Sequence, residues 1–104
     1  MIDISEKELK MVLDIIVNLA SDCEVRVFGS RFKGTAKKYS DIDLVIVGKE
    51  KLGLKRLGEL KEAFDESDLP YRVDILDYHA VNENIRKNID KGYETIFVPI
   101  TATP

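Results

Sequence analysis

The segment 41–47, Asp-Ile-Asp-Leu-Val-Ile-Val, constrains the fold of this 104-residue chain more than any other stretch. After its two acids the segment is apolar and largely β-branched, and Gly48 ends the run. Strands of this composition are usually covered on both faces. We therefore predict that 41–47 lies in the centre of a β-sheet, with helices packed against it.

The residues before this strand predict a helix and a first strand. Ser5 and Glu8 have the spacing of a capping box, and apolar residues then recur at helical spacing, which predicts a helix over about 5–21. Valines alternate with charged residues over 24–28, as in a half-buried strand. The basic stretch 29–40 leaves room for one short helical turn and a loop.

Three further elements are predicted after the central strand. Helical spacing of apolar residues predicts a helix over 49–67, and alternation predicts a strand over 71–76. Val81, Ile85 and Ile89 are four residues apart and predict a final helix. Gly92 is placed to close the last helix in the C-cap position, and the tail, 97–104, follows no clear pattern.

The order of these elements predicts an α/β (α+β) fold, with a small mixed β-sheet flanked by helices. The chain has the length of about one domain, so we expect residues 1–104 to form a single domain. With 44% hydrophobic residues the chain has enough apolar side chains to build one core.

Composition also narrows the functional classes. The only cysteine, Cys23, cannot form an internal disulfide, and neither a signal peptide nor a membrane-length apolar run is seen, so we expect a cytoplasmic protein. A net charge of -3 argues against stable nucleic-acid binding. The segment 25–40 nevertheless has five basic residues and no acid, which favours a small anionic ligand.

Two acids at the start of the central strand are the first candidates for chemistry. Asp41 and Asp43 are two residues apart, so on a strand their side chains leave the same face with α-carbons about 6.6 Å apart. Two such carboxylates repel each other, and a divalent cation bound by their oxygens usually offsets this repulsion. Alternatively, both are solvated at the exposed end of the strand.

Other residues point to the same site. Gly29 and Ser30 follow the first strand, where a glycine permits a sharp turn whose free backbone N–H groups can bind phosphate oxygens. Asp74 interrupts the otherwise apolar stretch 71–76, either as a paired structural carboxylate or as a third member of a metal site. His79, the only histidine, is better explained as a surface or helix-start residue than as a catalytic base.

The order of these residues resembles a known family. Gly29-Ser30, ten intervening residues, Asp41-Ile42-Asp43 and a later Asp74 look like the nucleotidyltransferase superfamily of DNA polymerase beta. The longer string GSRFKGTAKKYSDIDLVIVG resembles the minimal nucleotidyltransferases, the MNT partners of HEPN proteins in toxin–antitoxin pairs. The resemblance implies the nucleotidyltransferase fold for this chain.

The resemblance also implies roles for individual residues. Asp41, Asp43 and Asp74 would bind two Mg²⁺ ions, and Asp74 would help to take the proton from the attacking hydroxyl. Gly29 and Ser30 would hold the phosphates of ATP. Arg31 is expected to contact phosphate, with a position facing solvent as the alternative. Ser40 either touches the nucleotide or orients a carboxylate, although loop chemistry explains Ser40 nearly as well.

The implied function is transfer of AMP from ATP to a tyrosine hydroxyl of a HEPN toxin, which would make the chain an antitoxin and a partner in a hetero-oligomer. One alternative is an antitoxin that masks its partner without catalysis. Another is nucleotidyl transfer to a small molecule, which is weaker because the chain shows no substrate-binding extension. The sequence has no local signature for the preferred base.

Overall fold

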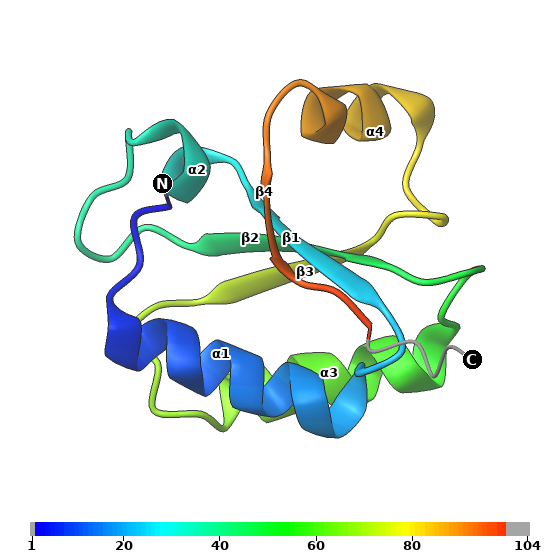
Figure 1. Cartoon of the computed structure of the whole chain (residues 1–104), viewed down its shortest axis with the longest axis horizontal. Helices are drawn as coiled ribbons and strands as arrows, with labels where there is room; N and C mark the ends of the chain where they lie inside the picture. Colours follow the sequence, from blue (N-terminus) through cyan, green and yellow to red (C-terminus); the bar gives the residue numbers. More distant parts are fainter. Residues whose placement is uncertain (1, 100–104) are drawn as a thin grey trace.

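The protein alternates helices and strands, as the computed structural model shows for residues 2–99 (Figure 1). The elements in chain order are α1 (Glu6–Leu19), β1 (Glu24–Phe28), α2 (Ser30–Lys33), β2 (Ile42–Val47), α3 (Leu54–Asp65), β3 (Val73–Asp77), α4 (Glu83–Asp90) and β4 (Glu94–Phe97). None of the helices within 2–99 is both long and apolar enough to cross a membrane.

The four strands form one mixed sheet in the order β3-β2-β1-β4. β1 pairs antiparallel with both β2 and β4, whereas β2 and β3 are parallel. A parallel pair needs a crossover between its strands, and α3 provides it. The predicted mixed sheet with flanking helices is therefore confirmed. The strand predicted over 41–47 is the inner strand β2, but it begins at Ile42, so Asp41 lies just before the strand and not on it.

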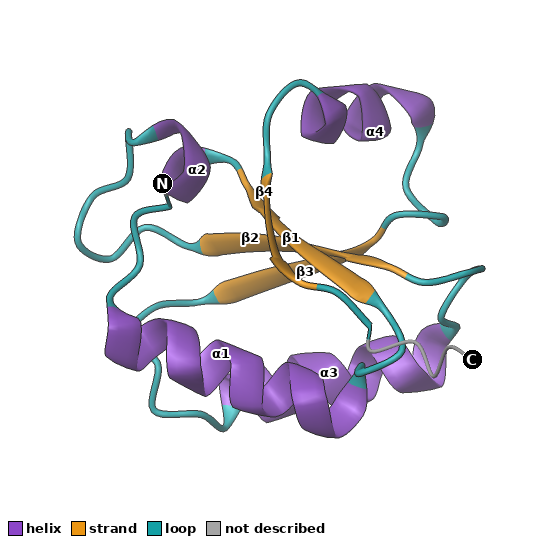
Figure 2. Cartoon of the chain, viewed as in Figure 1, coloured by secondary structure: helices purple, strands orange, loops and turns teal. Residues whose placement is uncertain are grey.

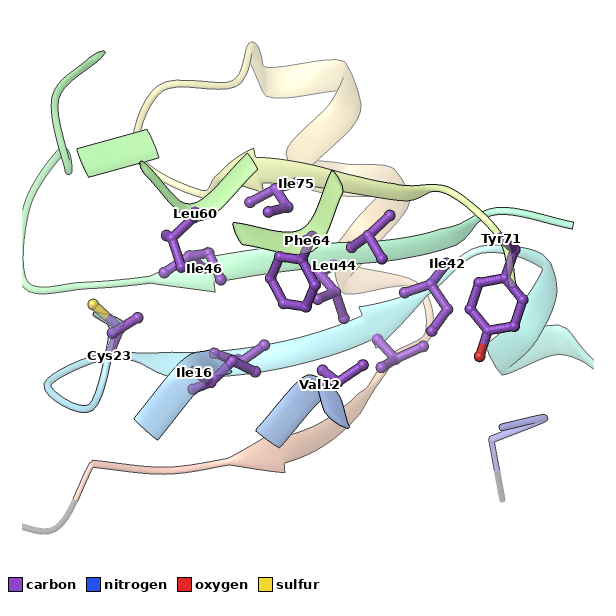
Figure 3. Close-up of a cluster of buried hydrophobic side chains, with 14 residues drawn as sticks. Val12, Ile16, Cys23, Ile42, Leu44, Ile46, Leu60, Phe64, Tyr71 and Ile75 are labelled. Atoms are coloured by element: carbon purple, nitrogen blue, oxygen red, sulfur yellow. The ribbon is translucent and has the colours of Figure 1, made fainter. Parts of the chain in front are cut away.

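α1 and α3 lie side by side across one face of the sheet (Figure 2). The main core lies between this helix pair and the sheet, with Val12 and Ile16 from α1, Leu60 and Phe64 from α3, and alternate residues of the strands (Figure 3). Ile42, Leu44 and Ile46 of β2 all point into this core. Because side chains alternate along a strand, Asp43 and Val45 face the opposite side of the sheet.

The opposite face of the sheet has a smaller apolar cluster made by Phe28, Val45 and Ile89. Ile89 comes from α4, which therefore covers only part of this face. Beyond the cluster, the Arg26 guanidinium lies 4.3 Å from the centre of the Tyr93 ring and 5.3 Å from that of Tyr78. These contacts fix α4 and its flanking loops and leave the end of the face with Asp43 open.

One predicted helix start agrees with the structure, whereas the ends of another helix and of a strand differ. The capping box is confirmed, since the Ser5 hydroxyl accepts from the Glu8 backbone and Glu8 accepts from Ser5 in return. The helix predicted over 49–67 begins only at Leu54, because Gly53 has a φ of 87° that no helix admits. The strand predicted over 71–76 runs from Val73 to Asp77.

Two predictions about the C-terminal part were incomplete or wrong. Lys91, not Gly92, caps α4, and Gly92 has no left-handed backbone. A side chain at Gly92 would instead come within 2.7 Å of the Phe32 ring, so the glycine is required by close packing. The segment 94–97 forms the edge strand β4, which the sequence analysis missed, and residues 100–104 of the ambiguous tail lie outside the described part.

Candidate active site

Asp43 and Asp74 lie opposite each other on neighbouring parallel strands. The register of β2 and β3 pairs Asp43 directly with Asp74, and neighbouring strands are about 4.8 Å apart. Asp41 immediately precedes β2. The fold thus brings the two acids of the central segment together with the third acid, which is 31 residues further along the chain.

The crowding of these acids changes the chemistry of Asp43. Burial raises the pKa of the Asp43 carboxyl, and the negative charges of Asp74 and Asp41 raise the pKa further. Within residues 2–99, neither Asp41 nor Asp43 has a cation or hydrogen-bond donor on its carboxylate. A half-buried carboxylate beside two others is costly for the fold, and a bound cation would remove that cost.

Gly29 allows β1 to turn directly against Asp43. Its φ of 71° lies in the left-handed region, and an added Cβ would overlap Oδ2 of Asp43. Phe28, the residue before it, is paired with Asp43 across the antiparallel β1–β2 ladder. Only glycine therefore combines this turn with this contact.

α2 begins at Ser30, immediately after this turn. The first backbone N–H groups of a helix have no acceptor within the helix, so those of Ser30 and Arg31 are available beside the Asp43 carboxylate. The predicted phosphate-binding turn is consequently next to the acids. The role of Gly29 and Ser30 in binding phosphate stays a prediction.

The three acids form an all-oxygen donor set that suits Mg²⁺. In the part of the chain that the structure describes, no three acidic, histidine or cysteine side chains are already gathered around one point. The Asp74 carboxylate has a contact of its own, since one of its oxygens is 3.3 Å from Nη2 of Arg72. The residues fit the cation by type and strand register, and side-chain rotation would complete the site.

Arg31 has a different place from the one that we expected. Its side chain is only 5% exposed, and its guanidinium donates to the carbonyls of Asp3, Lys38 and Ser40 over 2.7 to 3.2 Å. Burial among backbone carbonyls leaves it no open path to a phosphate. Arg31 instead fixes the loop that leads into Asp41.

Tyr71, which is buried as a packing residue, completes this support. The Arg31 guanidinium lies 3.9 Å from the centre of the Tyr71 ring, and the Tyr71 hydroxyl donates to Glu8 over 2.9 Å. Burial, together with the hydrogen bond to Glu8, raises the pKa of Tyr71. The contact links the approach to Asp41 with the segment before Asp74, and no local pattern could reveal it because its members are far apart in the sequence.

Ser40 and His79 have structural contacts. Oγ of Ser40 accepts from the Lys37 backbone at 2.8 Å and closes a turn within its own loop, so a contact with nucleotide stays a prediction. A ring nitrogen of His79 is 2.7 Å from the Gly48 carbonyl, and Asp77 accepts from the backbones of Leu52 and His79. The expectation that His79 is no catalytic base agrees with this position.

Comparison with known proteins identifies the family. Residues 10–99 match the family model described as Polymerase beta, Nucleotidyltransferase. The chain belongs to this nucleotidyltransferase family.

One relative is similar to this nucleotidyltransferase in sequence, and a solved structure is similar to it in fold. A probable protein adenylyltransferase, MntA of Haemophilus influenzae, is 50% identical over 95 residues, which cover 91% of this chain and 83% of the relative. A toxin–antitoxin crystal structure with AMP-PNP contains a chain that aligns with a TM-score of 0.74 at 19% identity, over 86% of this chain and 73% of that one.

A second solved structure has the same fold. It is a tri-AMPylated Shewanella oneidensis HEPN toxin in complex with an MNT antitoxin, aligned with a TM-score of 0.65 at 15% identity. The alignment covers 86% of this chain and 69% of that one. At such identities these two structures establish the fold.

Replacement of Gly29 tests the turn against Asp43. Gly29→Ala should lower the free energy of unfolding by about 2 kcal/mol and reduce nucleotidyl transfer at least about a hundredfold, because the methyl group displaces the Asp43 carboxylate. Gly34→Ala is the matched control, since Gly34 has a φ of 79° but open space around its Cβ position. The control should lose stability alone, and equal loss of transfer in both variants would contradict the role of Gly29.

The raised pKa of Asp43 predicts how the stability of the fold depends on pH. Because folding raises the pKa of Asp43, its ionised form destabilises the native state at neutral pH, and protonation at acid pH removes this cost. Asp43→Asn should therefore raise the free energy of unfolding of the metal-free protein at pH 7, and the gain should disappear as the pH falls through the raised pKa. Urea denaturation across this range measures it.

Asp68→Asn is the control for this measurement. Asp68 is exposed, and no interaction with its carboxylate is found within residues 2–99, so the same substitution should have little effect on stability at either pH. A loss of stability in Asp43→Asn at neutral pH would show that the carboxylate is stabilised by a contact and not crowded.

Proposed function

We propose that this chain is a Mg²⁺-dependent protein adenylyltransferase that transfers AMP from ATP to a tyrosine hydroxyl of a HEPN toxin and thereby acts as its antitoxin. The observation that carries the proposal is the pairing of Asp43 with Asp74 beside the Gly29 turn, in a chain that is 50% identical to MntA. The neighbouring structures with AMP-PNP and with an AMPylated HEPN toxin support the nucleotide and the acceptor.

Each residue of the site has a distinct part in the proposed reaction. Asp41, Asp43 and Asp74 would hold two Mg²⁺ ions, which when bound would supply positive charge to the phosphates and to the pyrophosphate leaving group. Gly29 and Ser30 present backbone N–H groups to the phosphates. Asp74, which lies beyond Asp43 as seen from Gly29, takes the proton of the attacking phenol. Arg31 and Tyr71 keep the two acidic segments at the required spacing.

The proposal extends to the state of the protein in the cell. We expect the single domain, residues 1–104, to act in the cytoplasm within a stable complex with its toxin. The solved toxin–antitoxin complexes of the same fold support such a hetero-oligomer. The one buried free thiol, Cys23, is compatible with a reducing compartment.

Label transfer tests this function. The purified chain is incubated with Mg²⁺, α-labelled ATP and the HEPN protein encoded beside it, and the labelled residue is mapped by mass spectrometry. Wild type should label a tyrosine of the partner. Asp43→Asn should reduce the rate at least about a hundredfold while it still binds the partner, since a ligand of the reacting centre is lost.

Asp68→Asn serves as the matched control and should label the partner at the wild-type rate. Equal labelling by wild type and Asp43→Asn would contradict the proposed site. A stable complex without any label, together with a neutralised toxin, would favour the alternative antitoxin that masks its partner without catalysis.

A further inference from the structure

Tyr39 is the most exposed tyrosine of the chain. It is 66% exposed, whereas Tyr71 is buried and Tyr78 and Tyr93 are partly buried. Within residues 2–99 its hydroxyl has no hydrogen-bond partner, whereas the hydroxyls of Tyr71 and Tyr78 donate to carboxylates. Tyr39 therefore presents its phenol to the solvent.

A tight turn carries Tyr39 at its tip. The Ser40 backbone donates to the Lys37 carbonyl over 3.1 Å and closes a four-residue turn, and the Ser40 hydroxyl accepts from the Lys37 backbone over 2.8 Å. Lys38 and Tyr39 are the two central residues of this turn. Lys37, Lys38 and Tyr39 are all exposed, so the turn projects from the surface.

Arg31 holds the backbone on both sides of Tyr39. Its buried guanidinium donates to the carbonyl of Lys38 over 3.2 Å and to the carbonyl of Ser40 over 2.7 Å. A backbone that is fixed before binding costs less entropy when another molecule recognises it. Tyr39 is thus an exposed side chain on a fixed backbone, an arrangement that suits recognition by a second protein.

The phenol of Tyr39 lies outside the site of its own chain. A pocket of about 570 Å³ has Asp43 and Asp74 on its wall, and Tyr39 is not among the residues within 2–99 that line it. Tyr39 is nevertheless only two residues before Asp41, so its turn is at the same end of the molecule as the acids. The reacting groups for this phenol therefore have to come from a second copy of the chain.

The charge around Tyr39 is complementary to a nucleotide bound in that second copy. Lys33, Lys37 and Lys38 are exposed and have no ion-pair partner within residues 2–99. Nζ of Lys38 is 5.3 Å from the centre of the Tyr39 ring. These cations would attract the triphosphate during the approach, and they would stabilise the negative phosphodiester that transfer leaves on the phenol.

We propose that Tyr39 is a modification site of this protein, to which a second copy of the chain transfers AMP from ATP. The inference rests on the proposed function and extends its acceptors from the toxin to the enzyme itself. The phenol oxygen of Tyr39 forms a bond to the α-phosphorus of ATP, the bond from that phosphorus to the bridging oxygen breaks, and pyrophosphate leaves. The phenolic proton passes to Asp74 of the second copy.

A mixture of two variants tests transfer between copies. The donor chain carries Tyr39→Phe, which keeps the ring, removes only the hydroxyl and leaves the three acids intact. The acceptor chain carries Asp43→Asn, which removes its own activity, and an affinity tag separates it from the donor. Both are incubated with Mg²⁺ and α-labelled ATP without the HEPN protein, and the labelled residue is mapped by mass spectrometry. The control acceptor carries Asp43→Asn together with Tyr39→Phe.

We expect label on Tyr39 of the acceptor chain and at least about tenfold less label on the control acceptor, because the attacking hydroxyl is removed. The donor should label the HEPN protein at a rate within about twofold of wild type, since Tyr39 lies outside the site. Equal labelling of the two acceptors would overturn the inference, as would an unlabelled acceptor beside a donor that labels the HEPN protein. A wild-type chain and a donor that both leave the HEPN protein unlabelled would instead refute the proposed function.

Discussion

The parallel pairing of β2 with β3 is the constraint on which the rest of the structure depends. Its register sets Asp43 opposite Asp74 and brings together acids that are far apart in the sequence. Parallel strands require a crossover, so α3 must pass over one face of the sheet and build the main core with α1. The acids face the other side, where α4 covers only part of the sheet. One pairing thus determines both the face that is buried under α1 and α3 and the face on which Asp43 and Asp74 lie.

The negative charges of Asp41 and Asp74 make the ionised form of Asp43 unfavourable, and contacts elsewhere in the protein stabilise the fold against this cost. Asp43 is half-buried beside two other carboxylates, and burial together with their negative charges raises its pKa. The compensation comes from the apolar cores on both faces and from Arg31, whose guanidinium binds three backbone carbonyls and stacks on Tyr71. Functional sites typically contain groups that lower the stability of the free protein, and binding of a cation or a substrate offsets that cost.

Sequence reasoning recovered those features that depend on local patterns. The capping box at Ser5, the central strand and the acids with their glycine turn each have a short-range signature. β4 has none, because its four half-buried or exposed residues are ordered by pairing with β1 rather than by their own alternation. Gly92 was assigned to a helix cap, whereas its real constraint is the distant Phe32 ring.

The contacts of Arg31 also could not be predicted from local sequence. Its position after Ser30 suggested a phosphate contact, but its partners come from segments near Asp3 and Ser40 that only the folded chain brings together. The match of residues 10–99 to the family model shows the family of the chain and does not depend on these contacts. Local sequence therefore predicts the candidate acids, whereas the contacts of Arg31 and Tyr71 are visible only in the tertiary structure.

Asp43 and Asp74, paired across β2 and β3, are expected to make nucleotide binding depend on a divalent cation. Calorimetric titration of the wild-type chain with AMP-PNP, in Mg²⁺ and then in EDTA, tests it most directly. The account predicts that removal of Mg²⁺ weakens binding at least about tenfold, and that Asp43→Asn binds weakly in both buffers. Equal affinity of the wild-type chain with and without Mg²⁺ would contradict the account, because the three aspartates would then have no cation to share with the nucleotide.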